Sequence, residues 1–477
     1  MTMFDAVCPM DGRYVGAEEE TIRETGPYLT IHAEIRYQLK VECALLEAYA
    51  ELGLLPGNHL EVLDSLQDDI DPEEVYEEEK TTQHNIRALV NVIQSRLDDA
   101  LKPFVHLGPT SADITDTARA LQVKDFVNNV FLKRLVGLEK NLIQLAEAGA
   151  GVTQVGRTHG QHAVPTTFGH AMALFVSRLG NRILALHNTA SRLVGKMAGA
   201  VGAYNSFSLL HPKDPRAVER IVMKRLGLET SPTGIASQIA EPEPLLDLCH
   251  AAVSTFSVIA NLADDLRHLM RTEIGELTKI TRKGHVGSST MPHKVNPKDF
   301  ENVKSLWKAF APRILTLYAD QISEHQRDLT NSASGRFVME LLAGCYYGTV
   351  RMERALRDVR MNQEAMKKNL AISRDTFVAE PLYIVSGLFR IPNAYEIIKN
   401  LAETARARGV TLSDVVKKDG WPEELDAKCD VETLEILDGI LDEPEGYRGL
   451  AEQVALETCR HWSRTLETLS GSSGQRT

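Results

Sequence analysis

One segment of the chain combines hydroxyl, ammonium and amide side chains within a short span. Residues 284–297 read GHVGSSTMPHKVNP, and Pro292 and Pro297 bracket Lys294 and Asn296. Because proline fixes φ, this half of the segment is stiff and aims its polar groups, whereas the glycine- and serine-rich half can close over a ligand. A phosphate-binding P-loop is excluded, since its GxxxxGK[ST] order is absent. The segment therefore predicts a ligand-binding loop, and a flexible surface loop is the alternative.

A second segment, residues 156–165, places a histidine among small residues in the sequence GRTHGQHAVP. His159 lies between Thr158 and Gly160, so backbone can approach a ligand closely on either side. Imidazoles ordinarily titrate near pH 6.5 and exchange protons at neutral pH, which suits general acid–base work. His162 follows, but no third ligand comes at zinc spacing and no HExxH occurs, so we expect no metal. A purely structural histidine is the alternative.

Three further segments gather polar and cationic groups. Residues 108–113 (GPTSAD) predict an N-cap that opens a helix, and the same N–H groups and hydroxyls also suit an anion. Residues 11–14 (DGRY) and 325–336 place arginines in otherwise acidic surroundings, and the second of these holds Arg327 and Arg336 with hydroxyls between them. Taken alone, each arginine patch is equally compatible with a solvated cluster of charges.

Long helices must position these segments. Apolar residues recur at helical steps in five stretches, and Pro312 interrupts the fourth: 113–148, 166–210, 245–274, 300–330 and 337–370. Each stretch predicts a helix of ~30 residues or more, with a kink at the proline. The stripes are not strict heptads, which favours a multi-helix bundle with a face buried against other subunits over a coiled coil.

The flanks carry shorter helical patterns, and no alternating strand pattern or repeat is evident. We therefore expect an all-α protein with three helical domains: an N-terminal domain (1–108), a central long-helix bundle (109–368) and a C-terminal domain (369–477). The last residues, Gly471–Thr477, are predicted to be disordered.

Composition restricts the class of protein. The chain has 477 residues, of which 43% are hydrophobic and 25% charged, as in soluble globular proteins. Its net charge of −12 argues against a nucleic-acid binder. The six cysteines form no CxxC pair, and the start has no signal-peptide pattern. No apolar stretch approaches the ~18 residues of a membrane helix. We expect a cytoplasmic protein with reduced thiols.

Taken together, the motifs resemble the aspartase/fumarase superfamily of lyases and, within it, the adenylosuccinate lyase family. Residues 287–297 match the superfamily's signature loop. The other segments that fit are 9–14, 81–85, 110–111, 156–161, 165–169, 199–205 and 326–332. The resemblance covers residues 9 to 400 in the right order. Two positions depart from it, since His162 stands where the family usually has Pro and Asn85 where it usually has Asp.

The resemblance implies a homotetramer with a twenty-helix core, five helices from each subunit, and active sites assembled from three chains. It implies β-elimination of fumarate from adenylosuccinate, giving AMP, and from SAICAR, giving AICAR, in purine synthesis. The partner is then a small anionic nucleotide, with no nucleic acid, membrane, metal or organic cofactor. The alternatives are another lyase of the superfamily, such as argininosuccinate lyase or a carboxymuconate cycloisomerase, or a non-catalytic helical scaffold.

The family pattern also implies roles for individual residues. Ser288 is the base, and its alkoxide requires N–H groups and a nearby cation. His159 is the general acid, and His84 orients the substrate or supports proton transfer. Lys294 and Asn296 hold the carboxylates of the fumaryl group. The remaining substrate-binding candidates are Arg13, Tyr14, Gln83, Asn85, Thr110, Ser111, Gln238, Arg327, Ser332, Ser334 and Arg336.

Overall fold

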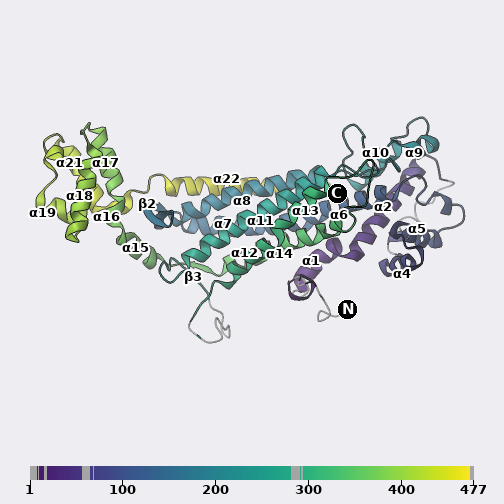
Figure 1. Ribbon diagram of the computed structural model, residues 1–477, viewed down its shortest axis with the longest axis horizontal. Helices are drawn as coiled ribbons and strands as arrows, with labels where there is room; N and C mark the ends of the chain where they lie inside the picture. Colours follow the sequence, from purple (N-terminus) through teal and green to yellow (C-terminus); the bar gives the residue numbers. More distant parts are fainter. Residues whose placement is uncertain are drawn as a thin grey trace. The chain divides into compact units, whose positions relative to one another are not determined.

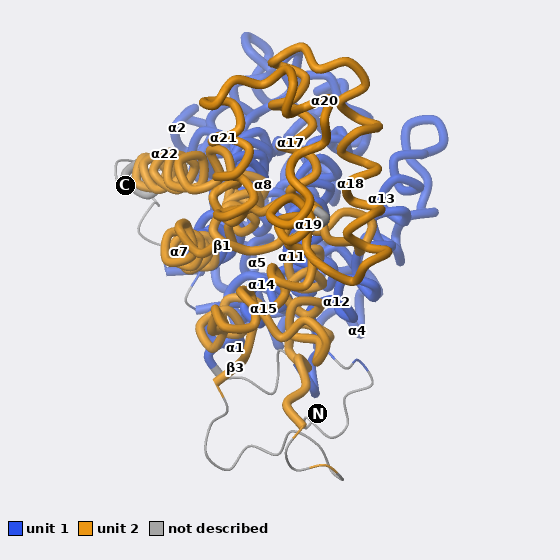
Figure 2. Tube along the Cα trace, turned by 90° about the vertical axis from the view of Figure 1, so that its left-hand side faces the viewer, with its two compact units in different colours: residues 1–137, 181–260, 302–351 blue, residues 138–180, 261–301, 352–477 orange. Residues whose placement is uncertain are grey.

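The computed structural model describes residues 8, 10–14, 19–55, 65–67, 69–280, 291 and 294–472. Most of these residues are helical, which confirms the all-α prediction (Figure 1). The chain forms two compact units, coloured in Figure 2. Unit 1 comprises residues 1–137, 181–260 and 302–351, and unit 2 comprises 138–180, 261–301 and 352–477. The predicted three-domain division stays a prediction.

The elements follow one another along the chain as three groups. The first is a π-turn Met10–Tyr14, α1 Glu19–Leu29, α2 Ile31–Glu51, α4 Pro72–Thr82, α5 Asn85–Arg96 and a 3₁₀ turn Lys102–Phe104. The second is α6 Ser111–Phe126, a π-turn Val127–Phe131, α7 Leu132–Ala148, β1 Thr153–Thr158, β2 Gln161–Thr167, α8 Phe168–Ser191, α9 Asn205–Leu210, α10 Ala217–Leu226, α11 Glu243–Leu269, β3 Leu277–Lys279, α12 Lys298–Phe310, a 3₁₀ turn Ala311–Arg313, α13 Ile314–Asp320, a 3₁₀ turn Ser334–Phe337, α14 Val338–Arg357 and β4 Val359–Met361. The third is α15 Gln363–Ile372, α16 Arg374–Phe377, α17 Ala379–Leu388, α18 Ala394–Arg408, α19 Leu412–Asp419, α20 Glu423–Asp426, α21 Val431–Asp442, a 3₁₀ turn Pro444–Gly446 and α22 Ala451–Ser472.

The first of the long helices is confirmed, because α6, the π-turn and α7 follow one another without a gap from Ser111 to Ala148. For the other stretches the expected length of ~30 residues or more is wrong, since the longest α-helix among them, α11, has 27 residues. α8 ends although no proline follows, since the chain after it pairs with a distant backbone: Gly195 N–H donates to Glu229 O at 3.0 Å. The expected fourth helix stops at Asp320, and Ser334 Oγ donates to that carboxylate at 2.6 Å. The kink predicted at Pro312 is confirmed as the 3₁₀ turn between α12 and α13.

Two small antiparallel sheets were not predicted. β1 pairs with β2 through a hairpin with a bulge between Val155 and Arg157, and β3 pairs with β4. The β1 and β2 strands have 6 and 7 residues, and β3 and β4 have 3 each. Gly156 and Pro165 interrupt the side-chain alternation that identifies a strand from sequence, so the period-2 pattern is absent.

Aromatic residues and glycines bring the helices of unit 1 together. The ring of Tyr346 on α14 lies 5.7 Å from Phe126 and 6.0 Å from Phe131, both in edge-on contact. A Cβ at Gly344 would lie 2.4 Å from the Phe310 ring, so α14 approaches α12 as closely as only glycine allows. This close packing makes the bundle rigid, which suits the positioning of side chains at its ends.

Unit 2 has its own core in the C-terminal helices. It centres on Leu382, Leu412, Leu425 and Leu437, which are all fully buried. α22 contacts α8 so closely that a Cβ at Gly180 would lie 2.3 Å from the Trp462 ring. α22 also includes the first two residues of the tail predicted to be disordered, while residues 473–477 lie outside the described part of the chain.

One described helix, α11, is long and apolar enough to cross a membrane by length and composition alone. Its most apolar window has a mean hydropathy of 1.5, and 67% of that window is buried inside the protein. Core contacts account for this: Phe256 of α11 packs at Gly348 of α14, and Ser257 accepts a hydrogen bond from Trp307 at 2.9 Å. The apolar character of α11 is that of a buried bundle helix.

Candidate functional site

In unit 1, the structure brings His84 and Ser111 together. His84 is the N-cap of α5, and its Nδ1 accepts the backbone N–H of Arg87 at 3.2 Å. Because Nδ1 is an acceptor, a neutral ring carries its proton on Nε2, which lies 3.4 Å from Ser111 Oγ. The imidazole is exposed; the start of α5 holds its Nδ1, and its protonated Nε2 is directed to the start of α6.

The neighbours of His84 sit at the junction of α4 and α5. Gln83 ends α4 in a left-handed conformation with φ of 52°, and its amide donates back to Lys80 O at 2.8 Å. Asn85, the first residue of α5, is exposed. The Thr82 hydroxyl donates to His84 O at 3.1 Å and so fixes the turn. In this arrangement Gln83 braces the junction, while Asn85 faces solvent beside His84.

Thr110 and Ser111 stand at the N-terminus of α6, as predicted from the capping pattern. Thr110 and Asp113 form a capping box, in which Thr110 N–H donates to Asp113 Oδ2 at 2.7 Å. Asp113 is fully buried and also accepts from Lys196 Nζ and from Ala198 N–H, the latter at 2.9 Å. This buried pair ties the start of α6 to the segment after α8.

That segment, residues 199–205, is one of the motifs singled out in the sequence. Gly202 has φ of 73°, and a Cβ there would lie 2.2 Å from Ala236 O. Tyr204 donates to Glu219 at 2.6 Å and to Gly234 O at 3.0 Å. Burial, followed by the Glu219 carboxylate, raises the pKa of Tyr204. The segment is therefore structural, and it fixes the loop that carries the half-buried Gln238.

The other predicted binding residues of unit 1 lie in two places. Arg13 and Tyr14 end the first π-turn, where Arg13 is exposed and the Tyr14 ring stacks 5.4 Å from Tyr347. Arg327, Ser332, Ser334 and Arg336 lie in or beside the loop after α13; Ser332 and Arg336 are exposed, and Ser334 bonds Asp320. Arg327 lies close enough to Asp116 to oppose the burial that raises the pKa of that carboxyl.

In unit 2, His159 occupies the tip of the β1–β2 hairpin. His159 and Gly160 are the two turn residues between the paired Thr158 and Gln161. Their φ values are 55° and 74°, which defines the primed type of turn that fits the twist of two strands. The His159 side chain is exposed at this tip. A short, regular turn therefore presents the imidazole away from the hairpin.

A buried carboxylate, Glu276, anchors the base of this hairpin. Its two oxygens accept from Arg157 Nη2 at 2.6 Å, Gln154 Nε2 at 2.6 Å and Asn369 Nδ2 at 2.8 Å. Across the hairpin, His162 lies opposite Arg157, and its Nδ1 is 2.6 Å from the Ser373 hydroxyl. Burial, helped by the Arg157 cation, lowers the pKa of His162.

Lys294 and Asn296 line a cleft of about 890 Å³ within unit 2. Arg267 at the end of α11 and Arg271 just after it line the same cleft, together with the carboxylates of Glu273 and of Glu301 on α12. The sequence analysis did not identify Arg267, because a basic residue in the last turn of a helix is an ordinary partner of its dipole. The cleft thus holds three cations and two carboxylates, and Arg267 also pairs with Asp264 at 3.1 Å. Ser288, the predicted base, lies outside the described residues.

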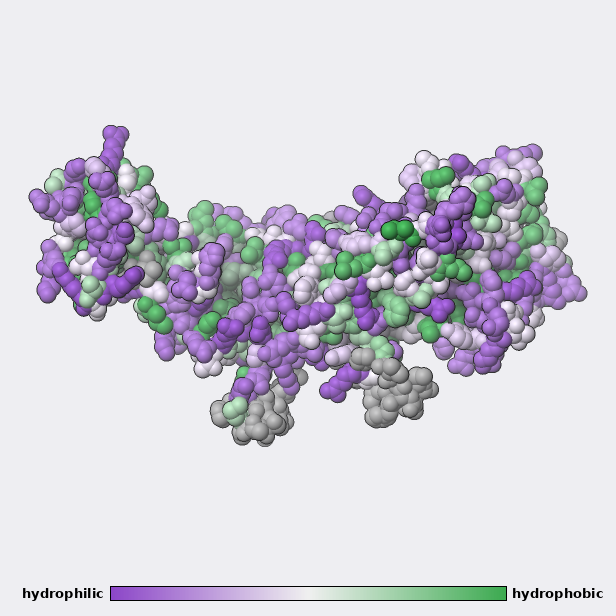
Figure 3. Space-filling model, in the orientation of Figure 1, coloured by the Kyte–Doolittle hydropathy of each residue, from purple (hydrophilic) through white to green (hydrophobic). Residues whose placement is uncertain are grey.

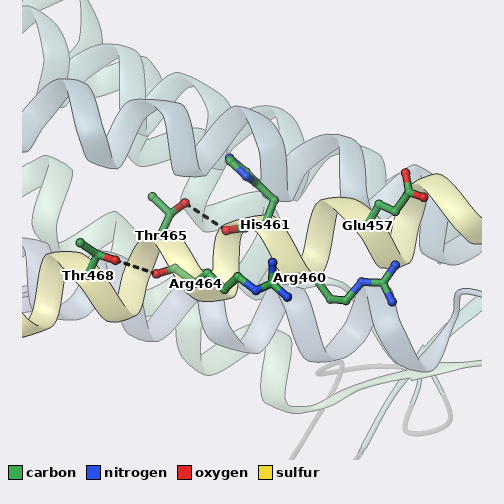
Figure 4. Close-up of a pocket in the computed structure, with 6 residues that line it drawn as sticks. All are labelled: Glu457, Arg460, His461, Arg464, Thr465 and Thr468. Atoms are coloured by element: carbon green, nitrogen blue, oxygen red, sulfur yellow. Dashed lines mark hydrogen bonds between the residues drawn. The ribbon is translucent and has the colours of Figure 1, made fainter.

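Two other hollows contain none of the candidate residues. One lies along α22, where Thr465 and Thr468 donate to carbonyls of their own helix and the flanking side chains point outward from one exposed face (Figure 4). The other, of about 600 Å³, is lined by C-terminal residues that include Tyr383 and Tyr395. Neither contains a residue that the sequence singled out for chemistry. Within the described ranges, no group of three or more His, Cys, Asp or Glu side chains is arranged to hold a metal ion.

Comparison with known proteins places the chain in a family. It matches the family model described as Lyase over residues 12–309 and the model described as Adenylosuccinate lyase C-terminal over residues 323–435. It is 33% identical to an adenylosuccinate lyase of Pyrococcus abyssi, with 94% of this chain and 96% of that one covered. It is 35% identical to the N-acetyl-S-(2-succino)cysteine lyase of Enterococcus italicus over 62% of this chain and 64% of that one.

Solved structures agree on the fold. A fumarate lyase from Mesorhizobium sp. BNC1 superimposes with a TM-score of 0.78 at 21% identity and covers 92% of this chain and 97% of that one. At 21% identity this structural likeness supports the fold alone, and the assignment to a family rests on the sequence matches. The chain therefore belongs to the adenylosuccinate lyase family of the aspartase/fumarase superfamily.

Proposed function

We propose that the protein is an adenylosuccinate lyase, which eliminates fumarate from adenylosuccinate to give AMP and from SAICAR to give AICAR. The observation that carries the proposal is the cleft in which Lys294 and Asn296 meet Arg267 and Arg271. The substrate bears two carboxylates and a phosphate, whereas the chain has a net charge of −12. Local cations must therefore overcome the repulsion of the whole protein, and this cleft contains three of them beside the carboxylates of Glu273 and Glu301.

The elimination needs one base and one acid. A base removes the proton from the carbon beside a carboxylate of the succinyl group, and the electron pair spreads onto that carboxylate. The carbon–nitrogen bond then breaks, a carbon–carbon double bond forms, and an acid protonates the departing nitrogen. Electrons are conserved between substrate and products, so the reaction requires no redox cofactor. Lys294 and Asn296 stabilise the transient charge by electrostatics and hydrogen bonding.

We assign the acid to His159 and the base to Ser288. The exposed tip of a rigid hairpin suits a general acid, because the imidazole must reach the leaving nitrogen without rearranging the fold. His84 supports proton transfer or substrate orientation, and its contact with Ser111 at 3.4 Å favours a donor on Nε2. Gln83 braces this junction, and Asn85 and Thr110 complete the polar surface around it.

The remaining candidates recognise the nucleotide. Arg13, Arg327 and Arg336 provide positive charge for the phosphate, and Tyr14, Gln238, Ser332 and Ser334 provide neutral donors. Each hydrogen bond to a charged group contributes ~1.5–3 kcal/mol, so the loss of any one arginine should weaken substrate binding.

The assembly we propose is a homotetramer in the cytoplasm, with each active site assembled from three chains. Large apolar side chains are exposed in and after α13, where Leu315 is 66%, Ile322 79% and Leu329 74% accessible. Hydrophobic residues also reach the surface around α13 in the space-filling view (Figure 3). Large apolar side chains exposed in this way support contact with other subunits.

The proposal is tested by supplying adenylosuccinate and SAICAR separately to the purified protein and following the formation of fumarate. We expect turnover of both substrates without added metal. The matched comparison is N-acetyl-S-(2-succino)cysteine, the substrate class named by the Enterococcus italicus relative, together with argininosuccinate. Turnover of either comparison substrate but not of adenylosuccinate would replace the proposed function, and fumarate from none of them would favour a helical scaffold.

A further inference from the structure

Glu276 is a buried carboxylate with donors on both of its oxygens. Its side chain is fully buried and pairs with Arg157 through both terminal guanidinium nitrogens, at 2.6 and 3.1 Å. Gln154 and Asn369 complete its hydrogen bonds at 2.6 and 2.8 Å. Two donors come from β1 and one from α15, so the carboxylate ties the hairpin to the helix that follows β4.

The pairing of β1 with β2 is irregular between the two β1 donors. Val155 pairs with Pro165 and Arg157 with His162, so one residue of β1 faces two of β2, and the extra residue belongs to β2. A Cβ at Gly156 would lie 2.7 Å from Val164 O, so this close approach of the two strands requires glycine. Gln154 and Arg157, on either side of this irregularity, each reach Glu276 at 2.6 Å.

The backbone beside Glu276 is held as firmly as its side chain. Asn362 N–H donates to Glu276 O at 2.9 Å, and the Asn362 amide donates to Gly275 O at 3.0 Å. Asn369 also donates to Ile274 O at 2.7 Å. The carboxylate is therefore a fixed point, and the hairpin is located relative to it.

We propose that Glu276 is a positioning residue for His159: it fixes the β1 strand whose turn presents the imidazole to the leaving nitrogen. The inference rests on the proposed elimination. Arg157 precedes His159 by two residues, so any rotation of β1 at Arg157 is carried to the turn. Glu276 itself is buried below the hairpin and touches no substrate, so its loss should lower kcat and leave KM within about threefold.

The charges around this anchor are also defined. Arg157 and His162 face it from the hairpin, Gln154 and Asn369 contribute neutral donors, and Ser373 caps the imidazole of His162. Replacing Glu276 with glutamine keeps the size of the side chain and removes the charge that pairs with Arg157, so the variant weakens the anchor without creating a cavity.

The test is a double-mutant cycle with four proteins: the wild type, Glu276→Gln, His159→Ala and the double variant. We expect Glu276→Gln to lower kcat by about 10–100-fold, to leave KM within about threefold, and to have no further effect in the His159→Ala background. The matched control is Glu353→Gln, which removes a buried carboxylate paired with Arg357 on α14 and should leave kcat unchanged. Losses of kcat that multiply in the double variant would overturn the proposal.

Asn369→Ala provides a second variant if Glu276→Gln does not fold. It removes one donor to the carboxylate and should lower kcat about 3–10-fold, again only when His159 is present. A variant that lowers the thermal midpoint but keeps the kcat and KM of the wild type would show a purely structural role and contradict the proposal. If the wild type turns over a different succinyl substrate, the same cycle is measured with that substrate. Failure of the proposed function is therefore distinguishable from failure of the positioning role of Glu276.

Discussion

Individual residues of this chain solve an electrostatic problem that the whole chain creates. The protein carries a net charge of −12, yet we propose that it binds a substrate with two carboxylates and a phosphate. Lys294, Arg267 and Arg271 place three cations in one cleft, where Glu273 and Glu301 offset part of their charge, and the buried pair of Asp113 and Lys196 cancels internally. Local cations of this kind attract anions despite the negative charge of the whole chain.

Glu139, in contrast, is a buried carboxyl group with no partner that would stabilise its ionised form among the described residues. Both of its carboxylate oxygens are buried without a hydrogen-bond partner in the part of the chain that the structure describes. Burial raises the pKa of the Glu139 carboxyl well above its usual range. The folded protein therefore favours the protonated acid, whereas the unfolded chain ionises with a pKa near ~4.3.

This difference predicts a pH-dependent stability cost. Below about pH 4 both states are protonated and the cost vanishes; as pH rises above that value, the unfolded state loses its proton and is favoured. Glu139→Gln should therefore raise the thermal midpoint, by little at about pH 5 and by about 2 °C or more at about pH 8. The control is Glu435→Gln, an exposed site with the same change of charge. An equal midpoint shift at every pH would refute the explanation.

At the scale of elements, short connections rather than long helices hold the candidate residues. The β1–β2 turn presents His159, the α4–α5 junction presents His84, and the segment 199–205 supports the start of α6 and the loop with Gln238. The segment 199–205 is fixed by the close approach of its backbone at Gly202 to the backbone of residues 236 and 237. The bundle provides a rigid base, and the connections determine where the polar groups point.

Gly202 offers a direct test of that close approach. A Cβ there would lie within 2.6 Å of three backbone atoms of residues 236 and 237, so Gly202→Ala must displace the loop that carries Gln238. We expect KM for adenylosuccinate to rise about tenfold or more and the thermal midpoint to fall. Gly227→Ala is the matched control, because Gly227 has a similar φ of 65° with open space around it. Equal effects of the two substitutions on KM would contradict this account.

Sequence patterns predicted where the helices lie better than they predicted the residues at which the helices end. The stripe from Leu248 to Leu266 gave α11 nearly complete, since helical periodicity is local information. The end of α8 depends on hydrogen bonds between Gly195 and Glu229, which are distant in sequence, so periodicity could not reveal it. The same holds for the site: the motif identified His159, but the anchor of its hairpin at Glu276 depends on contacts between residues more than 100 positions apart.

At the scale of the whole molecule, the two clusters of candidate residues belong to different units of one chain. His84, Thr110 and Ser111 lie in unit 1, and His159 and Lys294 lie in unit 2. The exposed apolar residues after α13 suit the assembly proposed above, in which several chains complete each site. Activity would then require the oligomer, and dilution that dissociates it would abolish turnover.

Mixed oligomers test this directly. His159→Ala and Ser288→Ala should each lower turnover by about 100-fold or more. If the two residues reach one site from different chains, subunit exchange between the variants should restore up to about a quarter of wild-type activity, because that share of sites receives both intact residues at random mixing. Light scattering verifies the oligomer, and each variant exchanged with itself is the control. Confirmed exchange without recovery would place both residues on one chain.

The π-turn Val127–Phe131 between α6 and α7 has a consequence for the spacing of the bundle's apolar residues. A wide turn holds one residue more than an α-turn, so everything beyond it is rotated about the helix axis without a break in the hydrogen-bond ladder. Phe126 and Phe131, five residues apart, are both fully buried, and Leu135 follows at the ordinary helical step of four. The extra residue thus corrects the angular position of the side chains that follow it. Without it the hydrophobic stripe would drift around the helix; with it the stripe faces the interior along both α6 and α7.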